Sequence, residues 1–210
     1  QKVVALAAGC GYPKYLQPPY KESDFWSALP DENSIGYSMA KKNLIIQSWT
    51  YREQYGFNSV VLLPANLYGP YDNFNLETSH VVPALVRKFL EAQERGDNEV
   101  VVWGTGVASR EFLYSEDTAL AIIAMAEKVN ETGPFNLGTG TETTIKELVE
   151  TIARLTEFEG EIVWDTSKPD GQPRRFYDRS KFKEAVGYVP DTTIEEGIKK
   201  TIEWYRVYGE

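Results

Sequence analysis

Lys2-Val-Val-Ala-Leu-Ala-Ala8 and Ser59-Val-Val-Leu-Leu63 are two short apolar runs that together decide the fold. Each has the length of a strand and lacks polar alternation, which predicts strands buried in a parallel sheet. Residues 34–55 lie between them with the pattern of a helix, and Gly56 follows as its stop signal. The order strand, helix, strand predicts a right-handed βαβ unit.

The rest of the chain continues as alternating helices and strands. We expect helices at 79–95, 117–128, 144–155 and 194–207, and strands at 99–103, 134–137 and 161–164. Thr144 with Glu147 and Thr193 with Glu196 have the spacing of capping boxes, which mark helix starts. The predicted fold class is α/β, with a partial Rossmann-like doubly wound parallel sheet and a smaller mixed α/β part.

Composition excludes several classes of protein. The 210 residues carry a formal net charge of −9, which argues against general binding to nucleic acid or acidic membranes. Cys10 and His80 are the only cysteine and the only histidine. An internal disulfide and a zinc site built of His and Cys are therefore both impossible, and we expect no metal. With no apolar run long enough for a membrane span, we expect a cytoplasmic protein.

Tyr37-Ser-Met-Ala-Lys41 places a phenol and an ammonium four positions apart on the expected helix. Side chains at this spacing share one face, and a lysine beside a tyrosine favours the phenolate. Such a phenol exchanges protons with a carbonyl or alcohol near neutral pH. The spacing also arises often by chance, and the alternative is a tyrosine facing the core beside a solvated lysine.

Four further segments accompany this pair. Ala8-Gly-Cys-Gly-Tyr-Pro-Lys14 and Asn66-Leu-Tyr-Gly-Pro70 follow the two apolar strands, at the edge where doubly wound sheets bind ligands. Ser79-His-Val-Val-Pro-Ala-Leu85 opens a helix, and Trp103-Gly-Thr-Gly-Val-Ala-Ser-Arg-Glu-Phe112 surrounds a glycine-rich turn.

With Asp72-Asn-Phe74 and Ser167-Lys-Pro-Asp-Gly171, these segments resemble the extended short-chain dehydrogenase/reductases of the NAD-dependent epimerase/dehydratase type. Within that family the resemblance is greatest to the GDP-L-fucose synthases, which are NADPH-dependent 3,5-epimerase/4-reductases of a GDP-4-keto-6-deoxy sugar. It implies that residues 1–70, with contributions from about 97–138, form the C-terminal part of a Rossmann-like dinucleotide-binding domain. Residues 71–96 and 139–210 would then bind the substrate.

The resemblance also implies catalytic roles. Tyr37 would protonate the C4 oxygen, and Lys41 would hold the cofactor ribose. Cys10 and His80 match the pair that exchanges protons at C3 and C5, where a neighbouring ketone makes the protons acidic. Without the resemblance, Cys10 reads as a small buried residue and His80 as a polar helix cap.

NADP(H) and a nucleotide-diphosphate sugar, with a GDP-sugar favoured, are the implied ligands. The expected cofactor-binding residues are Leu6, Ala7, Ala8, Gly9, Tyr37, Lys41, Pro64, Ala65, Asn66, Leu67 and His80. The expected substrate-binding residues are Asn66, Val81, Lys88, Trp103, Arg110, Asp170 and Arg174. Lys88 and Arg110 would grip the diphosphate, and Trp103 would offer an apolar wall to the base or ribose.

The chain departs from the family in two places. Ala8 stands where the family has Ser or Thr, whose hydroxyl binds the C4 oxygen; losing such a donor typically costs about 10²–10³ in rate. The sequence also lacks a Gly-x-x-Gly-x-x-Gly phosphate-binding turn. We therefore expect the C-terminal portion of a longer protein, and weak or no NADP(H) binding by this chain alone.

Three interpretations remain open at the level of sequence. The first is a fucose-synthase-like epimerase/reductase or an inactive fragment of one. The second is another nucleotide-sugar 4-epimerase or dehydratase of the same fold. The third is a non-catalytic sugar-nucleotide-binding or oligomerisation module. A homodimer is expected from the family, with Met39, Leu44, Ile45 and Trp49 as apolar surface of the helix at 34–55.

Overall fold

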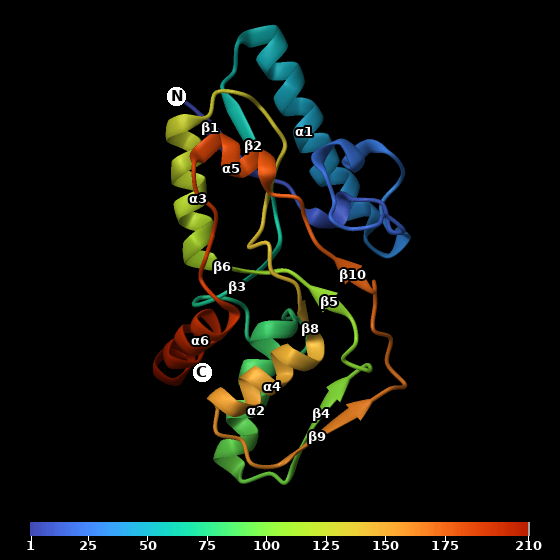
Figure 1. The fold of residues 1–210 in the computed structure, drawn as a ribbon, viewed down its shortest axis with the longest axis vertical. Coiled ribbons are helices and arrows are strands. Elements are labelled where there is room, and N and C mark those ends of the chain that lie inside the picture. The colour runs from blue at the N-terminus through green and yellow to red at the C-terminus, as the bar shows by residue number, and fades with distance from the viewer. Residues whose placement is uncertain (210) are drawn as a thin grey trace. The chain divides into compact units, whose positions relative to one another are not determined.

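The computed structural model describes residues 1–209 and has the α/β class that the sequence predicts (Figure 1). Its α-helices are α1 (Ile35–Tyr55), α2 (Val81–Arg95), α3 (Ser115–Lys128), α4 (Ile145–Leu155), α5 (Ser180–Val186) and α6 (Ile194–Tyr208). Its strands are β1 (Val3–Leu6), β2 (Ser59–Pro64), β3 (Asn66–Tyr68), β4 (Glu99–Trp103), β5 (Ser109–Arg110), β6 (Phe112–Tyr114), β7 (Phe135–Leu137), β8 (Thr143–Thr144), β9 (Glu161–Asp165) and β10 (Arg174–Arg175). Short 3₁₀ helices are η1 (Gly9–Gly11), η2 (Glu22–Trp26) and η3 (Glu32–Ser34).

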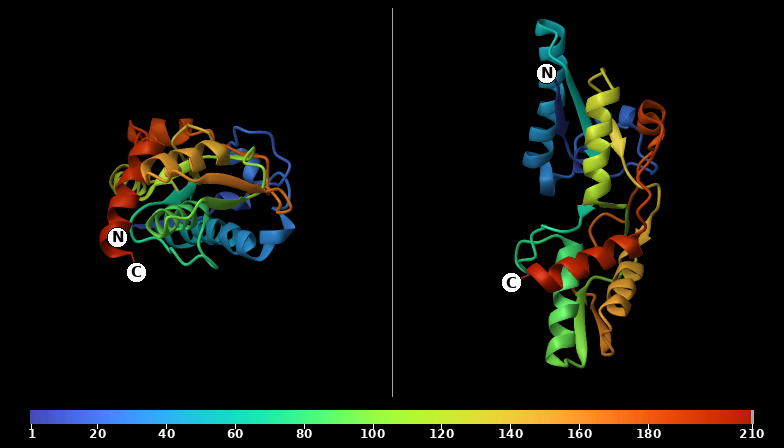
Figure 2. Two further views of the ribbon diagram at one scale, coloured as in Figure 1. Left: turned by 90° about the horizontal axis from the view of Figure 1, so that it is seen from below. Right: turned by 90° about the vertical axis from the view of Figure 1, so that its left-hand side faces the viewer.

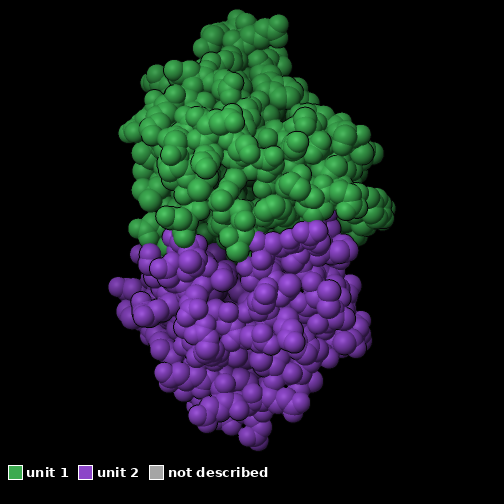
Figure 3. Space-filling view, viewed as in Figure 1, with its two compact units in different colours: residues 1–67, 111–141, 175–191 green, residues 68–110, 142–174, 192–210 purple. Residues whose placement is uncertain are grey.

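The chain divides into two compact units (Figure 3). Unit 1 comprises residues 1–67, 111–141 and 175–191, and unit 2 comprises 68–110, 142–174 and 192–210. These boundaries differ from the expected ones in two places. Strand β4 belongs to unit 2 because it pairs with β9 along its whole length. Helix α5 belongs to unit 1 because it packs on β7 and α3.

Unit 1 contains the βαβ arrangement predicted from the two apolar runs. Its sheet has the order β1-β2-β7, and β2 is parallel to both neighbours. Val3 pairs with Ser59 and Leu6 with Leu62, so the loops after β1 and β2 leave the sheet at one edge. Helices α1 and α3 lie on opposite sides of β1 and β2 (Figures 1 and 2).

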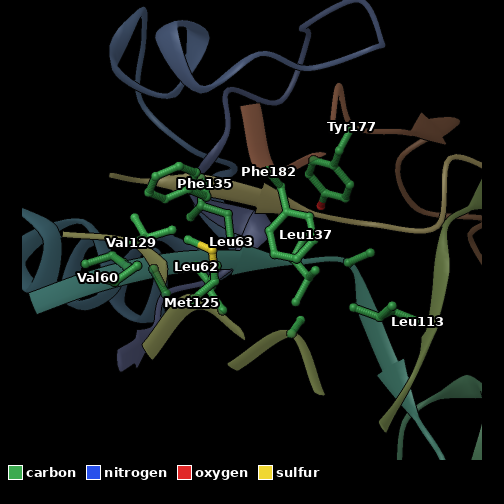
Figure 4. Packing of buried hydrophobic residues seen from close by; sticks show 14 of the residues in the cluster. Val60, Leu62, Leu63, Leu113, Met125, Val129, Phe135, Leu137, Tyr177 and Phe182 are labelled. Atoms are coloured by element: carbon green, nitrogen blue, oxygen red, sulfur yellow. The ribbon is translucent and has the colours of Figure 1, made fainter. Parts of the chain in front are cut away.

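The core of unit 1 is built around β2, whose Val60–Leu63 segment is fully buried. Side chains of β7 and α3 meet it there, among them Phe135, Leu137 and Met125 (Figure 4). An unbroken apolar strand suits a central position because both of its faces are covered.

The first apolar run was expected to be a buried strand, and this prediction was wrong. Strand β1 is half-buried, and its Val3 side chain is 45% exposed. Within residues 1–209, β1 pairs only with β2, so it is an edge strand of this sheet. One open side leaves its apolar side chains partly accessible.

Unit 2 packs α2, α4 and α6 together and places α2 against the parallel pair β4 and β9. Both predicted capping boxes are confirmed. The Thr144 hydroxyl accepts from Glu147 N at the start of α4, and the Thr193 hydroxyl accepts from Glu196 N at the start of α6. Within residues 1–209, no helix has both the length and the apolar character needed to cross a membrane.

Candidate active site

The first part of the candidate site is the turn that follows β1. Ala7 N donates to Leu62 O over 2.9 Å, which extends the β1–β2 pairing by one residue. The chain then bends into η1, where Gly9 is buried and Cys10 is half-buried. Cys10 is therefore not the fully buried apolar residue of the alternative interpretation.

Helix α1 carries Tyr37 and Lys41 on one face, as their spacing predicts. The Lys41 Nζ atom lies 5.6 Å from the centroid of the Tyr37 ring. The same ammonium donates to the carbonyl oxygen of Leu6 over 2.8 Å. Lys41 thus connects α1 to the carboxyl end of β1. Tyr37 is 58% exposed, which excludes the alternative of a tyrosine facing the core.

The pKa of Tyr37 is shifted in the direction opposite to the one expected from Lys41. Burial of the phenol, followed by electrostatic interaction with the nearby Cys10 side chain, raises the pKa of Tyr37 above its ordinary value. Tyr37 is consequently a protonated phenol at neutral pH, and such a phenol acts as an acid.

The turn after β2 lies at the same sheet edge. Ala65 N donates to Leu137 O over 2.8 Å, and Asn66 N donates to Glu111 O over 3.1 Å. These bonds fix the backbone of the turn and leave the Asn66 side chain half-buried. Pro64 is also half-buried, Ala65 is buried and Leu67 is 37% exposed.

Glu111 is a buried carboxylate that the sequence did not single out. Only 1% of it is exposed, and its carboxylate accepts from Gly140 N over 2.6 Å and from Tyr177 N over 3.1 Å. Burial raises the pKa of Glu111, and these N–H groups act in the opposite direction. Because Asn66 N donates to the Glu111 carbonyl, the residue joins the Asn66 turn to two other segments of unit 1.

His80 and Val81 lie in unit 2, at the start of α2. His80 is the residue that precedes the helix; it is exposed, and its side chain makes no capping hydrogen bond. The interpretation of His80 as a polar cap is therefore not supported. Val81 is the first residue of the helix and is 37% exposed.

The residues expected to grip the nucleotide also lie in unit 2. Lys88 Nζ donates to Val101 O over 2.7 Å, and burial lowers the pKa of this lysine. Trp103 is 67% exposed, and Lys168 Nζ lies 5.3 Å from its ring centroid. Arg110 donates to the carbonyl oxygen of Ser109 over 2.7 Å. Lys168 is a further candidate that the sequence alone did not single out, although its position two residues before Asp170 in the Ser-Lys-Pro-Asp-Gly motif was a signal for it.

Asp170 and Arg174 have partners within unit 2. The Asp170 carboxylate accepts from Thr105 N over 2.7 Å and from the Thr105 hydroxyl over 2.8 Å. It thereby anchors its own loop to the turn after Trp103. Arg174 binds both oxygens of Glu142, at 2.8 and 2.6 Å. Direct substrate contacts from these two residues remain predictions.

The ion pair between Glu142 and Arg174 predicts a pH-dependent stability. The hydrogen bonds from Arg174 and Ser109 lower the pKa of Glu142 from 4.5 to about 2. The pair therefore stabilises the fold fully above about pH 4.5, and this contribution is lost as the pH falls toward about 2. Glu142→Gln should lower the free energy of unfolding by about 1–2 kcal/mol at pH 7, since Arg174 is exposed and water screens it.

Urea denaturation between pH 7 and pH 3 measures this effect. The difference between wild type and Glu142→Gln should shrink as the pH falls. Glu150→Gln is the control, because its pair with Lys146 has 3.9 Å between N and O and lies on the surface. A difference that stays constant over the whole range would contradict the assignment.

The geometry of unit 1 defines a class of protein. A parallel βαβ unit, with a Tyr-x-x-x-Lys helix bonded to the carboxyl end of its first strand, is the arrangement of the extended short-chain dehydrogenase/reductases. Residues 1–138 match the NAD dependent epimerase/dehydratase family. The chain belongs to this family.

Relatives with known names agree with the assignment. The chain is 42% identical to the probable GDP-L-fucose synthase 1 of Oryza sativa subsp. japonica, over 98% of this chain and 62% of the relative. A GDP-L-fucose synthetase structure from Naegleria fowleri superposes with a TM-score of 0.93 at 30% identity, over 99% of this chain and 65% of that one. The NADP-bound structure of that synthetase gives a TM-score of 0.91 at 31% identity, over 98% and 66%. This chain thus spans less than two thirds of their length.

Proposed function

We propose that this chain carries catalytic and substrate-binding residues of an NADPH-dependent nucleotide-sugar epimerase/reductase that acts on a GDP-4-keto-6-deoxy sugar. The observation that carries the proposal is the arrangement of helix α1, which places Lys41 beside Tyr37 and is hydrogen-bonded to Leu6 O through Lys41 and to Cys10 O through Ser38. The relatives named GDP-L-fucose synthase and the NADP-bound synthetase support the choice of substrate and cofactor.

Epimerisation requires a base and an acid at carbons next to the ketone. A proton leaves C3 or C5 to give an enolate, and a proton returns to the opposite face of the same carbon. We assign these transfers to Cys10 and His80, because thiols and imidazoles both titrate near neutral pH. No redox change takes place, so this half of the reaction needs no hydride donor.

Reduction requires a proton at the C4 oxygen. NADPH, when bound, supplies the hydride to C4. Tyr37 gives its phenolic proton to the alkoxide that forms, which suits a phenol kept protonated by its surroundings. The donors that fit the cofactor are the Lys41 ammonium for the ribose hydroxyls and the Asn66 amide at the neighbouring turn. Ala8, with no hydroxyl, offers no side-chain donor to the C4 oxygen.

The exposed Trp103 ring and the cations of unit 2 suit the nucleotide. Lys88, Arg110 and Lys168 provide positive charge for a diphosphate, in a chain whose net charge is −9. Trp103 provides a flat apolar surface for a base. We therefore assign nucleotide binding to unit 2, and the dinucleotide together with Tyr37, Lys41 and Cys10 to unit 1; His80 of unit 2 is the remaining proposed catalytic residue.

Deuterium incorporation from D₂O tests the epimerase proposal. NMR of GDP-4-keto-6-deoxy-D-mannose, incubated with the chain, should show exchange at C3 and C5, and Cys10→Ser should slow it by about 10²–10³-fold. Because exchange consumes no NADPH, the result does not depend on cofactor affinity. Absence of exchange, with GDP binding detected by calorimetry, would favour the non-catalytic module. Inversion at C4 of a GDP-hexose that carries a C4 hydroxyl, incubated with the chain and the dinucleotide, would favour a 4-epimerase.

We also propose a cytoplasmic homodimer. Met39 and Trp49 on α1 are 43% and 38% exposed, and Ile46 is 45% exposed, so this helix offers apolar surface for a second copy. Ile45 is fully buried and belongs to the core instead. A reducing compartment suits a protein whose proposed base is a free thiol.

A further inference from the structure

The backbone carbonyl of Cys10 accepts a hydrogen bond from α1, the helix that carries Tyr37. The hydroxyl of Ser38, the next residue after Tyr37, donates to Cys10 O over 3.1 Å. Ser38 is fully buried, and its oxygen lies 3.2 Å from the hydroxyl of Ser34. A buried hydroxyl with a defined acceptor holds that acceptor in place, because breaking the bond would leave a polar group without water.

Aromatic rings pack against the glycines on both sides of Cys10. A Cβ atom at Gly9 would overlap the hydroxyl of Tyr177, and a Cβ atom at Gly11 would overlap the ring of Phe25. Both rings therefore touch the backbone of the turn directly. Glycine is required at these two positions for close approach of a ring.

Tyr177 is itself held firmly. Its backbone N–H donates to the Glu111 carboxylate over 3.1 Å, and its ring is buried. The ring centroid lies 5.7 Å from that of Tyr12 and 5.9 Å from that of Tyr20. A ring with this many fixed neighbours has little freedom to move away from Gly9.

We propose that Ser38 and Tyr177 are positioning residues for the Cys10 thiol. Ser38 fixes the turn from the α1 side, and Tyr177 fixes it from the core side. Both act through the backbone of η1, so neither needs to touch the substrate. The proposal rests on the proposed function only in giving Cys10 a proton to transfer, since the position of the thiol can be measured without substrate.

The single cysteine makes the test direct, because iodoacetamide can alkylate only Cys10. In Ser38→Ala the turn should open more often, and the alkylation rate of the native protein should rise about fivefold, the change that one lost hydrogen bond gives. The pH profile of alkylation should move as well, since the surroundings of the thiol change. Ser48→Ala, a buried serine on the same helix, is the matched control and should leave rate and profile unchanged.

A double-mutant cycle tests Tyr177. Gly9→Ala should raise the alkylation rate about tenfold or more, because the new Cβ overlaps the Tyr177 hydroxyl. Tyr177→Leu alone should also raise the rate, because the ring no longer holds the turn. Adding Tyr177→Leu to Gly9→Ala should cancel the part of the Gly9→Ala rise that comes from the overlap, so the double variant should react no faster than Tyr177→Leu alone. Tyr188→Phe is the control partner and should cancel none of it. Melting temperatures establish that each variant is folded; if Gly9→Ala does not fold, the Ser38 comparison decides.

Two results would overturn the proposal. One is a Ser38→Ala protein that reacts like wild type, or no differently from Ser48→Ala. The other is strict additivity of Gly9→Ala and Tyr177→Leu. Failure of the proposed function has another signature: the alkylation shifts appear, but deuterium exchange into the sugar does not.

Discussion

Tyr37→Phe should lower the rate of NADPH-dependent ketone reduction by about 10²–10⁴-fold, the range for loss of a general acid. Phenylalanine keeps the ring beside the Lys41 ammonium, and Lys41 keeps its bond to Leu6 O. Only the proton donor is removed, so stability and the positions of its neighbours should be retained. The measurement is NADPH consumption with the GDP-4-keto sugar, at an NADPH concentration high enough to offset weak binding by this chain.

The control for this variant lies about four turns further along the same helix. Tyr51 is 54% exposed, and Tyr51→Phe should leave the rate unchanged. Deuterium exchange at C3 and C5 should also survive in Tyr37→Phe, because Cys10 and His80 are intact. A Tyr37→Phe protein with more than about a tenth of wild-type reduction would remove Tyr37 from the acid role.

Glu111→Ala should lower the free energy of unfolding by about 3–5 kcal/mol. The substitution removes the carboxylate that accepts from the N–H groups of the half-buried Gly140 and the buried Tyr177. The substitution also removes the carboxylate that interacts with Arg179. The positive charge of Arg179 acts to lower the pKa of Glu111. Denaturant unfolding at neutral pH measures the loss.

Glu127→Ala is the matched control, since Glu127 is an exposed residue of α3 in the same unit. Its effect should be within about 0.5 kcal/mol. Glu111→Gln keeps one acceptor oxygen and should fall between the two. If Glu111→Ala and Glu127→Ala are equally stable, the network around Glu111 does not hold the unit together.

The elements that were predicted correctly have local signals. The apolar run of β2, the capping boxes of α4 and α6, and Gly56 after α1 each act within a few residues, and each appears in the structure. Helix α5 was missed because it has only 7 residues and no side-chain cap. The exposure of β1 was missed because it depends on which strands lie beside it, and an apolar run does not encode that.

In the candidate site too, features with a local sequence signal were predicted, and features that depend on distant contacts were missed. The spacing of Tyr37 and Lys41 predicted a shared helix face, and the bond from Lys41 to Leu6 O requires only that this helix pack beside β1. Glu111 was missed because most acidic residues are solvated, so sequence alone gives no reason to bury one. The fit of Tyr177 against Gly9 joins residues from distant parts of the chain, which no local pattern reveals.

The interleaving of the two units determines when each can fold. Unit 1 draws on three separate stretches, the last of which ends at residue 191. During synthesis its sheet cannot gain β7, and its Gly9 turn cannot meet Tyr177, until most of the chain has left the ribosome. Contacts so distant in sequence also close slowly, because large loops lose entropy when their ends meet. In a nascent chain halted before Tyr177, no ring packs against Gly9, and Cys10 should therefore react faster with thiol reagents.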